Sequence, residues 1–354
     1  MIVDSDGRVI GSFKSTVSFD DVLLVPNYSD IESRSEVSIG NNLGSHKYEL
    51  PIISSPMDTV TEETMCVAMH RLGGLGLVHR YNTIESQQKM IENLHDYGTD
   101  LRSFGAAVGV TGDYLHRSRA LVASGVNILC VDVAHGHHIL MERALKTLKD
   151  SFGDSVHIMA GNVATLDAFN ALSDWGADSV KVGIGGGSIC STRIQTGHGM
   201  PTLQSVIECA ASDRPAKLVA DGGIKTSGDI VKSLAAGADF VMLGSLLGGT
   251  DESPGEIYTS LDGKKYKAYR GMASREAQID WRGNVGSLEG IATTVPYKGS
   301  VVDILEDLTR GIRSGFSYSG ARSMEELHAK AKFVEQTAAA QVESSTHILR
   351  RNNG

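Results

Sequence analysis

The chain has 354 residues, 41% of them hydrophobic and 21% charged, which is typical of a folded protein and excludes a disordered one. Its formal net charge of −9 at pH 7 argues against a protein that coats nucleic acid, since such a protein needs a basic surface. The amino-terminal residues show no basic start followed by an apolar run, and no stretch reaches the roughly 20 apolar residues of a membrane span. We therefore expect a cytoplasmic protein without a membrane or nucleic-acid partner.

Eight short apolar runs follow one another along the chain, as is typical of parallel strands that are covered on their outer face. They lie at residues 51–57, 74–79, 105–110, 128–134, 156–161, 179–184, 217–223 and 240–245. Segments with a helical pattern precede the second, fourth, sixth and eighth runs, at residues 61–72, 113–124, 167–175 and 227–236. Eight strand–helix units predict an α/β fold, a single-domain (β/α)8 TIM barrel. An open doubly wound sheet is the alternative, and the count of eight favours the barrel.

The remaining segments are expected to be additions to one barrel domain that spans residues 1–354. Residues 1–50 are predicted to cover one end of the barrel, and residues 258–298 to form an insertion after strand eight. Residues 323–347 are predicted to form a helical segment near the carboxyl terminus. No internal repeat or low-complexity tract suggests a second domain.

Two glycine-containing loops are candidates for a phosphate site. Active sites of TIM barrels lie at the carboxyl ends of the strands, and phosphate sites often form from the loops after strands seven and eight. Here these loops carry Gly222-Gly223 and Gly244-Ser245, whose main-chain N–H groups and hydroxyl suit phosphate oxygens. The alternative is two ordinary tight turns. Asp221 precedes the first loop, and its carboxylate suits sugar hydroxyls rather than phosphate.

The loop after the sixth strand, residues 183–199, reads GIGGGSICSTRIQTGHG. Its start matches a dinucleotide-binding loop only in part, because the final glycine is missing and no helix start follows. A glycine-rich loop that presents Cys190 beside Thr192 and Arg193 favours a reactive thiol in an electropositive setting. The alternative is that Cys190 is a small filler residue.

The other cysteines and a group of histidines are interpreted as structural. Cys66, Cys130 and Cys209 lie in helix-like or strand-like runs, and no C-x-x-C pair indicates a zinc site or a disulfide framework. Three histidines at positions 135, 137 and 138 lack a matching carboxylate spacing, which argues against a metal site.

Polar residues also end the fourth and fifth strands. Asp132 and Asn162 are predicted to be site residues, because polar groups at the tips of barrel strands face the active-site end. An aspartate with histidine neighbours would suit a cofactor amide.

Several of these motifs occur together in one known family. The chain resembles the inosine-monophosphate dehydrogenase/guanosine-monophosphate reductase family along nearly its whole length. The matching stretches are SFDDVLLVP (18–26), SPMDTVT (55–61), DVAHGH (132–137), GNV (161–163), the loop 183–199, ADGGIKTSG (220–228), ADFVMLGS (238–245), YRGM (269–272) and VPYKG (295–299). The combination of GSICSTR with YRGM is highly specific.

The resemblance implies that Cys190 attacks C2 of a purine mononucleotide and forms a covalent thioimidate, with hydride transfer to or from a nicotinamide cofactor. Thr192 and Glu289 would act with Cys190 in catalysis. The implied substrate-binding residues are Ser55, Met57, Ser188, Asp221, Gly222, Gly223, Met242, Gly244, Ser245, Tyr269, Gly271 and Met272. Within this set, Asp221 would bind the ribose, and Gly223, Gly244, Ser245 and Tyr269 would bind the phosphate. Gly271 and Met272, together with Glu289, would contact the base.

The family also implies further ligands and an assembly. The implied cofactor-binding residues are Arg80, Asp132, Val133, Ala134, Asn162 and Lys181. Main-chain carbonyls of Gly185, Gly187 and Cys190 match the family's potassium site. A homotetramer is the usual assembly.

The two branches of the family differ in how they resolve the intermediate. The dehydrogenases use NAD and water, with a mobile flap that carries an Arg-Tyr pair; the reductases use NADPH and release ammonia from GMP. Here the interval from Ser274 to Glu289 spans only 289 − 274 = 15 positions, and Arg282 is followed by Gly283. The short interval favours a GMP reductase, as do SVIECA (205–210) and IMAGN (158–162).

Other motifs favour the alternative, an IMP dehydrogenase. They are SSPMDTVTE (54–62), DVAHGH (132–137), GTDESPGEIY (249–258) and the His79-Arg80 pair, where reductases usually have His-Lys. Absence of the two-module regulatory insert is usual in reductases and also occurs in some dehydrogenases. A catalytically inactive nucleotide-binding regulator is a third possibility, which the presence of the nucleophile disfavours.

Overall fold

The computed structural model describes residues 2–3, 9–11, 14–98 and 104–344. Eight parallel strands pair in sequence order, and the last pairs with the first to close a barrel. The strands are β6 (Ile52–Ser54), β7 (Leu75–Val78), β8 (Phe104–Val108), β9 (Ile128–Asp132), β10 (His157–Val163), β11 (Ser179–Val182), β12 (Lys217–Asp221) and β13 (Phe240–Leu243). Each overlaps one of the eight predicted runs, so the predicted TIM barrel is confirmed.

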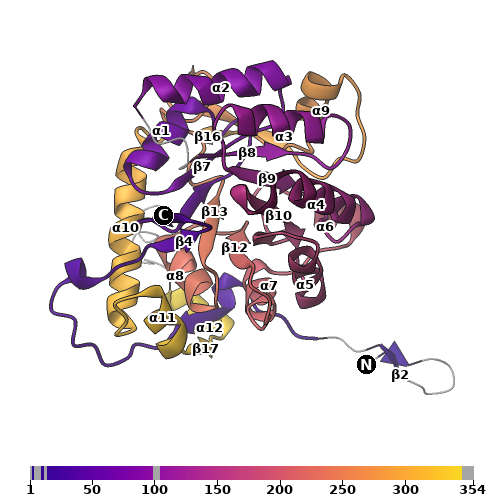
Figure 1. Cartoon of the computed structure of the whole chain (residues 1–354). Helices are drawn as coiled ribbons and strands as arrows, with labels where there is room; N and C mark the ends of the chain where they lie inside the picture. The colour runs from indigo at the N-terminus through magenta and orange to yellow at the C-terminus, as the bar shows by residue number, and fades with distance from the viewer. Residues whose placement is uncertain (1, 4–8, 12–13, 99–103, 345–354) are drawn as a thin grey trace.

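Helices on the outside of the barrel connect the strands (Figure 1). They are α1 (Glu63–Arg71), α2 (Ile84–Asp96), α3 (Tyr114–Ala123), α4 (Ile139–Phe152), α5 (Leu166–Asp174), α7 (Thr202–Cys209) and α8 (Ser227–Ala235), with the short helices η4 (Gly153–Ser155) and α6 (Thr192–Thr196) in the connections. Helix α8 begins at a capping box, in which Thr226 Oγ1 accepts from the Asp229 N–H and the Asp229 carboxylate accepts from the Thr226 N–H. The four predicted helices correspond to α1, α3, α5 and α8.

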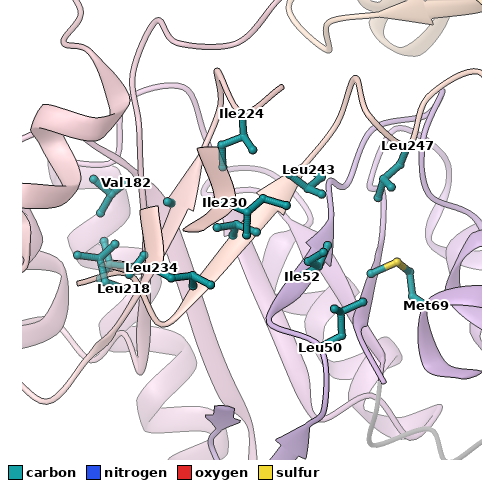
Figure 2. Close-up of a cluster of buried hydrophobic side chains, with 14 of the residues drawn as sticks. Leu50, Ile52, Met69, Val182, Leu218, Ile224, Ile230, Leu234, Leu243 and Leu247 are labelled. Carbon is teal, nitrogen blue, oxygen red and sulfur yellow. The ribbon is translucent and has the colours of Figure 1, made fainter. Parts of the chain in front are cut away.

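Two apolar layers hold the barrel together. The interior layer consists of side chains from alternate strand positions and from a covering hairpin: Leu43, Tyr48, Ile53, Leu75, Leu77, Ala107, Ile128, Cys130, Met159, Val219, Phe240 and Met242. The outer layer lies between strands and helices, where Ile230 and Leu234 of α8 pack near Leu218 of β12 (Figure 2). Because both faces of each strand are buried, the strands are largely apolar along their length.

The amino-terminal end of the barrel is covered by a hairpin of β4 (Asn41–Leu43) and β5 (His46–Tyr48). Its Tyr48 ring packs edge-on against Phe240, with 5.9 Å between the ring centroids. Earlier segments within residues 1–50 lie elsewhere: β3 (Val22–Leu24) pairs with a carboxyl-terminal strand, and β1 (Ile2–Val3) and β2 (Val9–Gly11) pair with each other away from the barrel (Figure 1). The short helices η1 (Phe19–Asp21) and η2 (Arg34–Glu36) flank β3.

The helical interpretation of residues 323–347 is wrong in its middle part. This segment forms α11 (Met324–Lys330), then strand β17 (Phe333–Glu335), then α12 (Ala338–Glu343), and residues 345–347 lie outside the described residues. Helix α11 ends because Ala331 adopts an extended conformation, and the following Phe-Val pair, which favours a strand, adds to the free edge of β3. The partner strand lies about 300 residues earlier in the chain, so no local sequence pattern predicts the pairing.

The insertion after strand eight forms an antiparallel sheet of β14 (Tyr258–Thr259), β15 (Lys265–Arg270) and β16 (Ala292–Pro296), with α9 (Arg275–Arg282) between the last two. Helix α10 (Val301–Tyr318) follows and packs on α8. Gly311 and Gly315 allow this close approach, because a Cβ on Gly315 would lie 2.6 Å from Val231 Cγ2. Neither α9 nor α10 was predicted as a separate helix.

Candidate active site

A cavity of about 390 Å³ opens at the carboxyl ends of the barrel strands. Its lining contains every residue predicted for catalysis or binding: Ser55, Met57, Arg80, Asp132, Val133, Ala134, Asn162, Lys181, Gly185, Gly187, Ser188, Cys190, Thr192, Asp221, Gly222, Gly223, Met242, Gly244, Ser245, Tyr269, Gly271, Met272 and Glu289. The fold therefore brings the whole predicted set into one place.

The thiol of Cys190 contacts a chain of two further groups. Cys190 Sγ lies 3.2 Å from Thr192 Oγ1, and Thr192 Oγ1 donates to Glu289 Oε2 at 2.9 Å. The other carboxylate oxygen of Glu289 accepts from Ser287 Oγ at 3.1 Å. This arrangement gives the thiol proton a path through a hydroxyl to a carboxylate. Arg193, which was expected to give the thiol an electropositive setting, has its side chain against the main chain at Gly185 and Gly199.

Main-chain pairing holds Glu289 beside the cysteine loop, although the two segments are 99 positions apart (289 − 190). Cys190 and Gly290 form an antiparallel bridge, and the Ser191 N–H donates to the Glu289 carbonyl at 3.0 Å. The Ile291 N–H donates to the Ile189 carbonyl at 3.1 Å. The insertion after strand eight thus adds a short strand to the loop that carries the nucleophile, and this addition aligns the carboxylate with Thr192.

The two loops predicted to bind phosphate both line the cavity, and the loop of Gly244 lies against the hydroxyl of Tyr269. A Cβ on Gly244 would lie 2.9 Å from this hydroxyl, so only glycine leaves the space open. Gly223 has φ +79°, in the left-handed region that favours glycine, and a Cβ there would lie 3.1 Å from the Gly186 carbonyl oxygen. Burial raises the pKa of Tyr269 to about 12, while hydrogen bonds with Ser188 and Ser245 oppose this shift. Tyr269 is therefore a neutral hydrogen-bonding group at neutral pH.

A buried charge network forms the floor of the cavity. Lys181 of β11 is 1% exposed, and its ammonium contacts Asp132 Oδ1 of β9 and lies 3.8 Å from Asp221 Oδ2 of β12. Asn162 Nδ2 donates to the same Asp221 oxygen at 2.8 Å. Burial alone lowers the pKa of Lys181, but the two carboxylates outweigh it and the net pKa is raised; burial also raises the pKa of Asp221. Lys181 thus lies in the predicted cofactor region with its charge already engaged by two aspartates.

Arg80 reaches the cavity from the loop after β7. Its Nη2 donates to the main-chain oxygen of Asp132 at 3.2 Å, and its Nε is buried and has no hydrogen-bond partner among the described residues. The preceding residue, His79, fixes this loop, because its Nε2 pairs with Glu62 Oε1 at 2.9 Å and its Nδ1 accepts from the Tyr81 N–H. An unsatisfied guanidinium donor beside Asp132 fits an anionic cofactor.

The main-chain oxygens around Cys190 are the kind of donor that binds a potassium ion. The Gly187 carbonyl accepts from the Cys190 N–H at 3.2 Å and keeps a second lone pair. The donor chemistry therefore fits the cation that the family implies. Within the described part of the chain, no group of three or more His, Cys, Asp or Glu side chains is arranged to hold a metal ion.

The histidines after β9 have contacts of their own. His138 caps α4 by accepting from the Leu140 N–H, and His137 packs against Trp175 with 5.8 Å between the ring centroids. Cys66, Cys130 and Cys209 are buried, as predicted for filler residues. Cys190 is partly exposed.

Sequence reasoning missed several cavity residues. Tyr81, Ile189 and Gly290 line the cavity, and each directly follows or precedes a predicted site residue. Ser287 was also missed, although it contacts Glu289 from two positions away. Closeness in sequence to a predicted residue was the available signal for all four.

The fold and this cavity define a TIM-barrel enzyme whose thiol faces glycine-lined loops. A family model described as "IMP dehydrogenase / GMP reductase domain" matches residues 16–347. The chain belongs to this family and is a purine-nucleotide oxidoreductase.

Relatives carry both names of the family. The IMP dehydrogenase of Cryptosporidium parvum is 39% identical over 94% of this chain and 94% of its own, and that of Nitrosopumilus maritimus is 35% identical over 95% and 98%. The GMP reductase of Leishmania major is 32% identical over 94% and 97%. Among solved structures, a variant of the GMP reductase from Trypanosoma brucei in complex with guanosine 5′-monophosphate superposes with a TM-score of 0.89, at 32% identity over 95% of this chain and 98% of that one.

The alignment lengths show that this chain is shorter than some of its relatives. The alignment with the Nitrosopumilus maritimus enzyme runs over 471 positions, at least 471 − 354 = 117 of which have no residue here. The alignment with the Cryptosporidium parvum enzyme runs over only 384. A relative named as a dehydrogenase thus also aligns without a long insert, so insert length does not separate the two branches. No helix in the described ranges has the length and apolar character needed to cross a membrane.

Proposed function

We propose that the protein is a GMP reductase, which converts GMP to IMP and ammonia with NADPH as the reductant. The observation that carries the proposal is the contact chain from Cys190 through Thr192 to Glu289. It links the nucleophile to a proton-handling pair, as release of an amine requires. In addition, α9 and a short loop occupy the interval in which dehydrogenases of the family carry their flap.

The first step forms a bond between Cys190 Sγ and purine C2 and breaks the bond from C2 to the amino nitrogen. The thiol proton passes through the Thr192 hydroxyl to Glu289, and Glu289 returns a proton to the departing nitrogen, which leaves as ammonia. In the second step C2 gains a hydride and the Sγ–C2 bond breaks, giving IMP and the Cys190 thiolate. The reduced nicotinamide of NADPH, when bound, is the source of this hydride.

The other cavity residues orient the substrate in this proposal. Asp221 accepts from the ribose hydroxyls through Oδ1, because its contacts with Asn162 and Lys181 both fall on the other oxygen, Oδ2. The loops of Gly223 and Gly244 direct main-chain N–H groups toward the phosphate. Asp132, Val133, Ala134, Asn162 and Arg80 would hold the cofactor. A potassium ion on the Gly185, Gly187 and Cys190 carbonyls, a homotetramer and a cytoplasmic location stay predictions.

An IMP dehydrogenase is the second candidate function. The observation that favours it is identity: relatives with that name range from 31% to 39% identical, whereas the reductases of Leishmania major and Leishmania donovani are 32% and 31% identical. In that reaction water would resolve the intermediate and NAD would accept the hydride.

The deciding experiment mixes the purified protein with GMP plus NADPH and, separately, with IMP plus NAD, and follows the absorbance of the reduced nicotinamide. Consumption in the first mixture alone supports the reductase, and production in the second alone replaces it with the dehydrogenase. Cys190→Ala should abolish activity, whereas Cys209→Ala, at a buried cysteine away from the cavity, should retain it. Incubation with a 6-chloropurine nucleotide, followed by intact-mass measurement, tests for a covalent adduct at Cys190. If the protein binds nucleotide but shows neither turnover nor this adduct, it is a regulator.

A further inference from the structure

Two arginines lie over one tryptophan ring, which contacts Arg80 and Tyr81 of the cavity lining. The guanidinium carbon of Arg282 lies 4.4 Å from the Trp281 ring centroid, and that of Arg80 lies 5.5 Å from it. Arg80 also lies 5.0 Å from the ring centroid of Tyr81, which meets Trp281 edge-on at 5.3 Å. We call these four residues the arginine–tryptophan cluster. It joins the loop after β7 to the last turn of α9.

Ion pairs fix the α9 side of the cluster. Arg270 of β15 donates to Asp58 Oδ2 at 2.6 Å and to Asp280 Oδ2 at 2.5 Å. Asp280 directly precedes Trp281, so this bridge holds the last turn of α9 against the loop after β6. Because the His79–Glu62 pair holds the other side, the geometry of the cluster is preformed.

The cluster carries two positive charges. Among the described residues, neither Arg80 nor Arg282 forms an ion pair with a carboxylate, and the buried Nε of Arg80 lacks a hydrogen-bond partner. Two guanidinium groups that share one ring repel each other. The cluster is therefore a local concentration of positive charge in a chain whose net charge is −9. Stacking engages the guanidinium faces and leaves their N–H edges available, which suits bidentate contacts with phosphate.

The position of the cluster separates it from the predicted phosphate site of the nucleotide. That site lies on the loops after β12 and β13, whereas Arg80 lies beside Gly109 at the end of β8 and Asp132 at the end of β9. In the eight-stranded ring, β8 is opposite β12 and β9 is opposite β13. An anion held here therefore belongs to a second ligand across the mouth from the nucleotide phosphate.

We propose that Arg80 and Arg282, stacked on Trp281, bind the phosphate groups of the dinucleotide cofactor, and that α9 thereby supplies a cofactor-binding residue which motif comparison did not identify. This inference rests on the proposed function, in that a dinucleotide occupies the cavity beside the purine nucleotide. The pyrophosphate and the 2′-phosphate of NADPH share the chemistry that the cluster recognises, and comparison with NADH distinguishes them.

The test measures dinucleotide binding with IMP present, because IMP and a reduced dinucleotide do not react in either branch of the family. The chain has two tryptophans, so Trp175→Phe leaves Trp281 as the only tryptophan reporter. We expect NADPH to quench it, and Arg282→Ala to raise the Kd about tenfold or more by removing a charge-assisted contact. Arg275→Ala is the matched control, since Arg275 is an exposed arginine at the other end of α9. The Kd of IMP should stay unchanged in both variants.

The outcomes separate this inference from the proposed function. If Arg282→Ala raises the Kd of NADPH by a larger factor than the Kd of NADH, the cluster binds the 2′-phosphate. If the two Kd values rise by the same factor, the cluster binds the pyrophosphate. Equal Kd values for the Arg282→Ala and Arg275→Ala variants would overturn the inference, even if the wild type reduces GMP with NADPH. If the wild type instead oxidises IMP with NAD, the reductase proposal fails, and the ratio of NADH Kd values between the two variants still decides the inference.

Discussion

The buried ammonium of Lys181 allows a prediction with a defined pH signature. Lys181→Met keeps the approximate length of the side chain but removes the charge that contacts Asp132 and Asp221. Removing one partner from a buried ion pair destabilises a protein by roughly 3–5 kcal/mol. Both aspartates retain about 20% side-chain exposure in the cavity, so we expect the lower end, about 3 kcal/mol. With an unfolding entropy of about 2.1 cal/mol/K per residue over the whole chain, this corresponds to a Tm decrease of roughly 4 °C.

The pH dependence follows from the carboxylates that the variant leaves unpaired. Burial already raises the pKa of Asp221, and loss of Lys181, which lowers it, raises the pKa further. A carboxyl group whose pKa is higher in the folded than in the unfolded state binds more protons when folded, so acidification stabilises the fold relative to wild type. The Tm deficit of Lys181→Met should therefore shrink between pH 8 and pH 5, while Lys181→Arg restores most of the stability at both.

Thermal unfolding at the two pH values measures this difference directly. Nucleotide affinity gives a second readout, because a protonated Asp221 is a poorer acceptor for ribose hydroxyls: as the pH is lowered, the Kd of IMP should begin to rise at a higher pH in Lys181→Met than in Lys181→Arg. A Tm deficit of the same size at pH 8 and pH 5 would refute the reasoning, since it would assign the loss to packing rather than to charge.

Four further predictions follow from named contacts. Glu289→Gln keeps a hydrogen-bond partner for Thr192 but cannot take its proton, so kcat should fall roughly 10²- to 10⁴-fold with little change in GMP binding; unchanged turnover would exclude the relay. Gly244→Ala places a methyl group against the Tyr269 hydroxyl and should raise the KM for GMP, with a normal melting temperature as the control. Phe240→Ala opens a cavity inside the barrel and should reduce the free energy of unfolding by roughly 3–5 kcal/mol in urea titrations. Burial lowers the pKa of His157 to about 4, below its unfolded value of 6.5, so its contribution to stability is present above pH 6.5 and is lost as the pH falls toward 4; a His157→Gln variant should lose less stability over that window than wild type.

Much of this protein follows from its sequence because the relevant information is local. A strand buried on both faces is largely apolar along its length, so the eight barrel strands could be located without coordinates. Positions that need space or a left-handed backbone must be glycine, which marked Gly223 and Gly244. A single glycine-rich loop contains the nucleophile with its neighbours, so Cys190 and Thr192 were found by motif.

Only the tertiary structure decided how distant segments meet. Glu289 aligns with Thr192 because the segment after α9 pairs with the cysteine loop, and β17 forms because β3 offers a free edge far away along the chain. The charge of Lys181 on β11 is engaged by Asp221 of the adjacent strand β12 and by Asp132 of β9, two strands away, and the barrel register sets both contacts. The arginine–tryptophan cluster joins the loop after β7 to α9, far apart along the chain. Such contacts depend on loop closure and packing rather than on local pattern, so the sequence names the residues but not their partners.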